Sequence, residues 1–161
     1  MRHTITMLVE NKFGVLSRIS GLFSGRGYNI ESLSVGETMD PAYSQMTVVT
    51  SGDDLIIEQI TKQLNKLVDV IKVTDVTEFE HVEREMVLIK VKPKTERKAE
   101  VLNLAGIFRG RVVDSSEDTY TIEVTGDEKK IDAFVNLMTP IGIKELVRTG
   151  KVAILREGMK K

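Results

Sequence analysis

Hydrophobic and polar positions along this chain follow two different periods, and the order of those periods predicts the fold. Residues 4–10 have the period of two that is typical of a strand. The next segment has apolar residues at the three-and-four spacing of an amphipathic helix, namely Leu16, Ile19, Leu22 and Phe23. Gly25 and Gly27 are expected to end this helix, because glycine adopts the left-handed cap conformation at little cost.

The rest of the first half continues with a hairpin, a helix and a strand. Residues 29–36 and 45–50 are strand-like on either side of a turn at Asp40-Pro41. Asp53 is placed to cap a second helix, whose apolar stripe is Ile56, Ile57, Ile60, Leu64 and Leu67. Residues 68–79 again have the period of two that is typical of a strand. The predicted order is βαββαβ.

The second half repeats that order. Residues 85–91 are strand-like, a helix stripe follows, residues 111–114 and 120–125 form a hairpin, and residues 143–155 are extended with a break near Gly150. The two helix stripes are Val101, Leu102, Ala105 and Phe108, and, after the cap Asp127, Ile131, Phe134, Val135 and Met138. We therefore predict an α+β fold with two ferredoxin-like βαββαβ domains in tandem, residues 1–79 and 80–161.

Composition limits the possible functions. The chain has 161 residues, 41% hydrophobic and 29% charged, which is ordinary for a globular protein. A net charge of −1 argues against affinity driven by nucleic-acid phosphates. The absence of cysteine excludes disulfides, thiolate metal sites and a cysteine nucleophile. No apolar run approaches 20 residues and no signal peptide is evident, so we expect a cytoplasmic protein with no membrane partner.

Other functional classes find little support. The first and third predicted strands, residues 4–10 and 45–50, contain no aromatic residue to stack RNA bases. His3 and His81 are the only imidazoles, so we expect neither a metal site nor catalytic residues. A transcription regulator would need a helix-turn-helix, which the pattern does not contain. An independent enzyme lacks a credible nucleophile or acid–base pair.

The start of the first helix is the strongest candidate for a binding site. Its free N–H groups attract a carboxylate, and Gly14 lets a ligand approach the backbone. Asn11 offers an amide oxygen for an ammonium group and an amide N–H₂ for a carboxylate. These groups suit a small zwitterion. The alternative is that Asn11 only caps the helix, as asparagine often does.

Asn29 and Ile30 begin the second predicted strand, at a sheet edge that could face a second protomer. They would supply a polar contact and a small apolar wall, although a turn after Gly27 explains Asn29 equally well. The segment 108–111, Phe-Arg-Gly-Arg, could be a small phosphate-binding patch. Cations followed by glycine at a helix C-terminus more often form a cap.

Several segments together carry a family resemblance. Residues 11–19 (NKFGVLSRI) and 23–33 (FSGRGYNIESL) closely resemble the small regulatory subunit of acetolactate synthase, also called acetohydroxyacid synthase. Further matching segments are Asp40-Pro41 with residues 44–47, and residues 63–70, 81–85, 107–111 and 130–134. The resemblance covers essentially the whole chain. One departure is Phe13, where the family more often has proline or a small residue.

The resemblance implies a function for each half. Residues 1–79 would be an ACT domain that forms a homodimer and binds valine, or another branched-chain amino acid, at the dimer interface. Residues 80–161 would contact a separate catalytic subunit, which would hold thiamine diphosphate, a divalent metal and FAD, with no cofactor in this chain. The implied effector residues are Asn11, Gly14, Val15 and Leu16 of one protomer with Asn29 and Ile30 of the other.

The implied protein is thus a non-catalytic subunit that activates acetolactate synthase and confers feedback inhibition in branched-chain amino-acid biosynthesis. The alternative is an ACT-type amino-acid sensor that serves a different metabolic enzyme.

Overall fold

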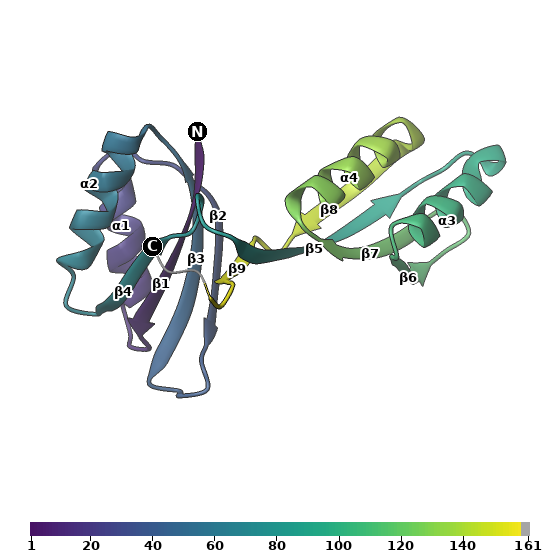
Figure 1. The fold of residues 1–161 in the computed structure, drawn as a ribbon. Helices are drawn as coiled ribbons and strands as arrows, with labels where there is room; N and C mark the ends of the chain where they lie inside the picture. Colours follow the sequence, from purple (N-terminus) through teal and green to yellow (C-terminus); the bar gives the residue numbers. More distant parts are fainter. Residues whose placement is uncertain (159–161) are drawn as a thin grey trace. The chain divides into compact units, whose positions relative to one another are not determined.

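Two compact units make up the computed structural model, which describes residues 1–158. The first unit consists of Met1–Val82 and the segment that starts at Lys151, and the second is Glu83–Gly150. The first sheet has four strands and the second has five, of which the last in the chain is residues 152–155, and two helices lie on one face of each sheet (Figure 1). The predicted α+β fold of tandem ferredoxin-like βαββαβ units is confirmed.

The first unit contains six elements in the predicted order. They are β1 (Arg2–Glu10), α1 (Val15–Gly25), β2 (Ile30–Glu37), β3 (Tyr43–Ser51), α2 (Asp54–Asn65) and β4 (Val70–Asp75). The strand order β2-β3-β1-β4 puts β1 and β3 in the centre and leaves β2 at one edge. Ile5 lies opposite Val48, and Met7 opposite Met46, so alternate apolar side chains of both central strands face the helices.

Apolar side chains from one face of this sheet and from both helices form the first core. Its buried members are Ile5, Met7, Val9, Val15, Ile19, Phe23, Met46, Val48, Ile57, Ile60, Leu64 and Val70. The predicted cap of α2 is present, since the Ile56 N–H donates to the Asp53 carboxylate at 2.9 Å. Gly27 has a φ of 72°, which lets the chain turn sharply after α1.

The second unit has the same arrangement. Its elements are β5 (His81–Val91), a short 3₁₀ turn (Thr95–Arg97), α3 (Lys98–Ile107), β6 (Arg111–Ser115), β7 (Tyr120–Gly126), α4 (Glu128–Gly142) and β8 (Ile143–Arg148). The strand order is β6-β7-β5-β8. Phe134 of α4 lies fully buried in the core and its ring centroid is 5.3 Å from that of Phe108. The Lys130 N–H donates to Asp127, the predicted cap.

The segment that starts at Lys151 groups with the first compact unit, while its strand β9 (Val152–Leu155) pairs with β5. The Lys151 N–H donates to Ser32 Oγ (3.0 Å), and the Arg156 N–H donates to the Glu80 carbonyl oxygen (3.1 Å). Hydrophobic alternation predicts an extended segment after Gly150 but does not say which sheet that segment joins.

The turn between α3 and β6 contains Arg109 and Gly110, from the segment considered above as a phosphate-binding patch. The Arg109 N–H donates to the Gly106 carbonyl (3.1 Å) and the Gly110 N–H to the Ala105 carbonyl (2.7 Å), which is the bonding pattern of a Schellman cap. Arg109 itself has the left-handed φ of 54°, where glycine is usual. Gly110 comes one residue later because a Cβ there would lie 2.9 Å from the Glu123 carbonyl oxygen. The segment therefore forms a helix cap.

We expect Arg109→Gly to raise the free energy of unfolding by about 0.5–1 kcal/mol. Relief of the left-handed strain exceeds the entropy that glycine adds to the unfolded chain. Urea denaturation followed by circular dichroism measures the change. Arg26→Gly is the matched control, because Arg26 follows α1 with a φ of −107° and should gain nothing. Equal stabilisation by both substitutions would contradict this account.

Candidate functional site

Asn11 lies just after β1 and is bound to the turn that connects β2 with β3. Its N–H donates to the Ala42 carbonyl oxygen (2.8 Å). Its side-chain Nδ2 donates to the Pro41 carbonyl oxygen (2.9 Å) and to Oε1 of Glu37 (3.1 Å). The N-cap of α1 is Gly14, and no side chain caps that helix. The alternative role of Asn11 as a helix cap is therefore wrong.

These two contacts fix the orientation of the Asn11 amide. A carbonyl and a carboxylate only accept hydrogen bonds, so the N–H₂ group must face them. Both amide hydrogens are then used. Among the described residues, Oδ1 of Asn11 has no donor in contact, so the group that Asn11 can offer to a ligand is an acceptor. An acceptor suits an ammonium group and does not suit a carboxylate.

The residues after Asn11 supply donors. Gly14 has a φ of 83°, and α1 begins at Val15. The first helical bond runs from the Arg18 N–H to the Gly14 carbonyl oxygen (3.0 Å). Within residues 1–158, the Leu16 and Ser17 N–H groups have no backbone acceptor, as expected for a helix N-terminus. They can bind a carboxylate, and the partial positive charge of the helix end favours it.

The apolar residues of this loop divide between core and surface. Val15 is buried in the first core, so it supports the loop and its side chain does not reach solvent. Leu16 is 46% exposed and can contact a ligand. Phe13 and Met39 are fully exposed, although both are large and apolar. Exposed apolar side chains on two loops joined by the Asn11 hydrogen bonds favour a surface that a second protein covers.

The structure places Asn29 and Ile30 far from Asn11 in the same chain. Ile30 pairs with Thr50 on β3, and the Asn29 carbonyl accepts a hydrogen bond from Thr50 Oγ1 (2.7 Å). Asn11 bonds to Ala42, next to the opposite end of β3. Seven residues of strand separate Tyr43 from Thr50, which corresponds to about 23 Å. One chain therefore brings Asn11, Gly14, Val15 and Leu16 together but not Asn29 or Ile30.

Ion pairs hold the charged side chains around the loop. Lys12 Nζ lies 2.8 Å from the Glu10 carboxylate, and this hydrogen bond raises the pKa of Lys12 above its ordinary value. Arg18 Nε donates to Asp69 at 2.8 Å. Both cations thus have carboxylate partners already, and neither is needed to explain where a ligand carboxylate would bind.

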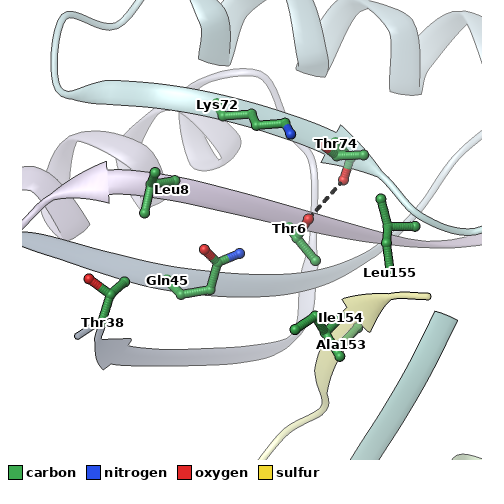
Figure 2. Close-up of a pocket in the computed structure, with 9 residues that line it drawn as sticks. All are labelled: Thr6, Leu8, Thr38, Gln45, Lys72, Thr74, Ala153, Ile154 and Leu155. Carbon is green, nitrogen blue, oxygen red and sulfur yellow. Dashed lines mark hydrogen bonds between the residues drawn. The ribbon is translucent and has the colours of Figure 1, made fainter. Parts of the chain in front are cut away.

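A separate hollow of about 430 Å³ lies on the helix-free face of the first sheet, where β9 crosses it (Figure 2). Its lining residues are Thr6, Leu8, Thr38, Gln45, Lys72, Thr74, Ala153, Ile154 and Leu155. None of the six residues predicted as a ligand site lines this hollow. Thr38 nevertheless connects it to the turn that holds Asn11, because Thr38 Oγ1 donates to the Asp40 carbonyl oxygen (2.8 Å).

Metal-ligating clusters and membrane-length helices are both absent among the described residues. Residues 1–158 contain no group of three or more metal-ligating side chains, and His3 pairs with Asp75 at 2.8 Å. No helix among these residues has the length and apolar character needed to cross a membrane.

Comparisons with known proteins identify the family. A model of the acetohydroxyacid synthase small-subunit-like ACT domain matches residues 5–72, and a model of the small subunit of acetolactate synthase matches residues 84–157. The chain belongs to the acetolactate synthase small-subunit family. The predicted resemblance and the ACT domain are both confirmed.

Individual relatives cover nearly the whole chain. The acetolactate synthase small subunit of Aquifex aeolicus is 57% identical over 157 residues, 97% of this chain and 82% of the relative. A probable small subunit of Archaeoglobus fulgidus is 56% identical over 99% of this chain and 100% of its own length. The crystal structure of the small subunit from Thermotoga maritima superposes with a TM-score of 0.88 at 44% identity, covering 99% of both chains.

Two groups of the candidate site in this small-subunit homologue were not identified from the sequence. They are the Glu37 side chain and the Pro41 carbonyl. Neither belongs to the loop that carries Asn11, and only the register of β1 against β3 brings them there. The turn at Asp40-Pro41 was visible in the sequence, but nothing in the sequence indicated which side chain it would hold.

We expect Gly14→Ala to lower the free energy of unfolding by about 1 kcal/mol or more. A side chain at a φ of 83° is strained, and its Cβ would lie 3.1 Å from Arg18 Nη1. Gly21→Ala in the middle of α1 is the matched control, because its Cβ would meet no atom within 4 Å. That substitution should stabilise by about 0.5–1 kcal/mol. Chemical denaturation of both variants checks the difference in sign.

Proposed function

We propose that this protein is the regulatory subunit that binds valine, or another branched-chain amino acid, between two ACT domains, and through it activates and feedback-inhibits acetolactate synthase. The single observation that carries the proposal is the loop 11–17, which presents an acceptor at Asn11 and free N–H groups at Leu16 and Ser17. Acceptor and donors in one loop match the ammonium and carboxylate of an α-amino acid. Membership of the small-subunit family and the ACT domain supports a regulatory role.

The edge strand β2 offers the means to complete the site from a second copy. It lies at the edge of the sheet, where its neighbour is β3, and an edge strand can pair with a strand of another chain. Antiparallel pairing of two β2 strands about a two-fold axis would put the start of one opposite the end of the other. Ile30 of the second copy would then lie beside Glu37, which contacts Asn11. Asn29 and Ile30 would thus reach the loop that their own chain keeps about 23 Å away.

In this arrangement the carboxylate of valine binds the N–H groups of α1, and its ammonium binds Asn11 Oδ1. Its isopropyl group packs between Leu16 and Ile30 of the second copy. An apolar pocket discriminates one methylene by only about 1–3 kcal/mol, so valine, leucine and isoleucine should all bind. Feedback inhibition then requires that valine favour one assembly state by about 1–3 kcal/mol.

The catalytic chemistry belongs to the partner in this proposal. The name "small subunit" implies a separate catalytic subunit. We place thiamine diphosphate, the divalent metal and FAD on that subunit, and we assign to residues 83–150 the contact with it. This chain contributes recognition of the amino acid and transmits its presence through the ACT dimer.

The proposal is tested by mixing the purified protein with its cognate acetolactate synthase catalytic subunit and measuring acetolactate formation with and without valine. We expect activation by the wild-type protein and inhibition on adding valine. Asn11→Ala should still activate, while its half-inhibitory valine concentration rises at least tenfold, because the ammonium loses its acceptor. Failure to activate any acetolactate synthase catalytic subunit would instead favour a sensor that serves a different enzyme.

The dimer is tested separately with Val35→Lys. Val35 lies on β2 and is 47% exposed in the single chain. A lysine on an edge strand opposes pairing of that edge, so we expect monomers in sedimentation analysis and loss of valine binding in calorimetry. Val68→Lys is the matched control, since Val68 is 91% exposed and lies outside the strands. A Val35→Lys dimer that binds valine normally would contradict the two-protomer site.

A further inference from the structure

We propose that Glu37 is a positioning residue that makes the effector site selective for an α-amino acid over the 2-oxo acid of the same carbon skeleton. The inference rests on the proposed function and concerns the same site. Glu37 acts through Asn11, because its Oε1 accepts a hydrogen bond from Asn11 Nδ2 at 3.1 Å.

The selectivity follows from which atom Asn11 turns toward the ligand. The Pro41 carbonyl and Glu37 use both hydrogens of the amide, so Oδ1 is the remaining group. The ammonium of valine can donate to Oδ1. The keto oxygen of 2-oxoisovalerate, which takes the place of that ammonium, is itself an acceptor. Two acceptors facing each other without a proton between them repel, and the desolvation of both is not compensated.

Glu37 makes the alternative orientation of the amide unfavourable. If the Asn11 amide turned over, Oδ1 would face both a carbonyl and a carboxylate oxygen. Only that orientation would let Nδ2 donate to a keto oxygen. The negative charge of Glu37 makes the cost of turning larger than a neutral acceptor would, because hydrogen bonds to ionised groups are stronger than neutral ones.

The position of Glu37 also connects this selection to dimerisation. Glu37 is the last residue of β2 and is exposed in the single chain. In the proposed pairing of two β2 strands, the start of the second β2 arrives at this end and removes water from around the Asn11–Glu37 bond. A hydrogen bond strengthens as the local dielectric constant falls. The amide is therefore held most firmly in the state that binds ligand.

Only a polar group can make this selection. An apolar pocket cannot distinguish an amino acid from its 2-oxo acid, because their side chains are identical. The distinction has to come from the polar group that meets the 2-position.

The experiment compares the dissociation constants of valine and 2-oxoisovalerate by calorimetry. The proteins are the wild type, Glu37→Ala and Glu37→Gln, and Glu58→Ala is the matched control that removes an exposed, ion-paired carboxylate from α2. We expect Glu37→Ala to weaken valine binding about three- to tenfold, the effect of one partly exposed charge-assisted hydrogen bond, and to leave 2-oxoisovalerate binding unchanged or tighter. Glu37→Gln should retain most of the preference, because its amide oxygen accepts the same bond. Glu58→Ala should match the wild type.

Three results would overturn the inference. An unchanged ratio of the two dissociation constants in Glu37→Ala would remove any role in selectivity. Equal losses of valine affinity in Glu37→Ala and Glu37→Gln would mean that the charge of Glu37 acts on the ligand directly rather than by positioning Asn11. If Glu37→Ala weakened valine binding as much in the Asn11→Ala variant as in the wild type, Glu37 would likewise act on the ligand directly and not through Asn11. Absence of valine binding by the wild type would overturn the proposed function as well, so the two failures are distinguishable.

Discussion

The antiparallel pairing of β3 with β1 on one side and β2 on the other determines where every candidate ligand contact lies. Register places Asn11 beside Ala42 and Ile30 beside Thr50, at opposite ends of the same strand. A strand of fixed rise cannot bring its two ends together. In the proposed site, the contacts for the charged groups of an amino acid and those for its side chain are thereby separated within one chain, and a second copy of the chain would rejoin them.

Two left-handed turns in this protein, at Gly14 and Arg109, serve different purposes. Gly14 carries the left-handed turn that directs the free N–H groups of α1 outward, and glycine there removes the strain. Arg109 carries a left-handed turn without that relief, and the glycine of this turn, Gly110, comes one residue later, where a Cβ would lie 2.9 Å from the Glu123 carbonyl oxygen. The two turns show that a glycine in a motif does not by itself indicate a ligand. Beside Gly14 the Leu16 and Ser17 N–H groups have no backbone acceptor among residues 1–158, whereas beside Arg109 the N–H groups are bound within the cap.

Much of the fold could be predicted from the sequence because it depends on local patterns. Periodicity predicted both βαββαβ units, and Asp53 and Asp127 were recognisable as caps from their position before an apolar stripe. The hydrogen bonds that join the segment from Lys151 onward to Ser32 and Glu80 could not be predicted in this way, since alternation does not identify the partners of a strand. The sequence also identified Asn11 and Gly14 as candidates, but not Glu37, whose contact with Asn11 depends on strand register. Val15 is one of the effector residues implied by the resemblance, and the structure shows that its side chain is buried and supports the loop from inside.

A site shared between two protomers has a thermodynamic consequence beyond recognition. A ligand that needs groups from both chains binds only the dimer, so its binding and dimerisation must favour each other equally. The same reciprocity extends to the catalytic partner if that partner distinguishes between arrangements of the ACT dimer. Asn11 holds the turn between β2 and β3 through three hydrogen bonds, and that turn directly follows the edge strand on which pairing depends. In the proposed dimer, a ligand bound at Asn11 would therefore act directly on the residues at the end of the paired edge, and in this way an amino acid would alter the assembly.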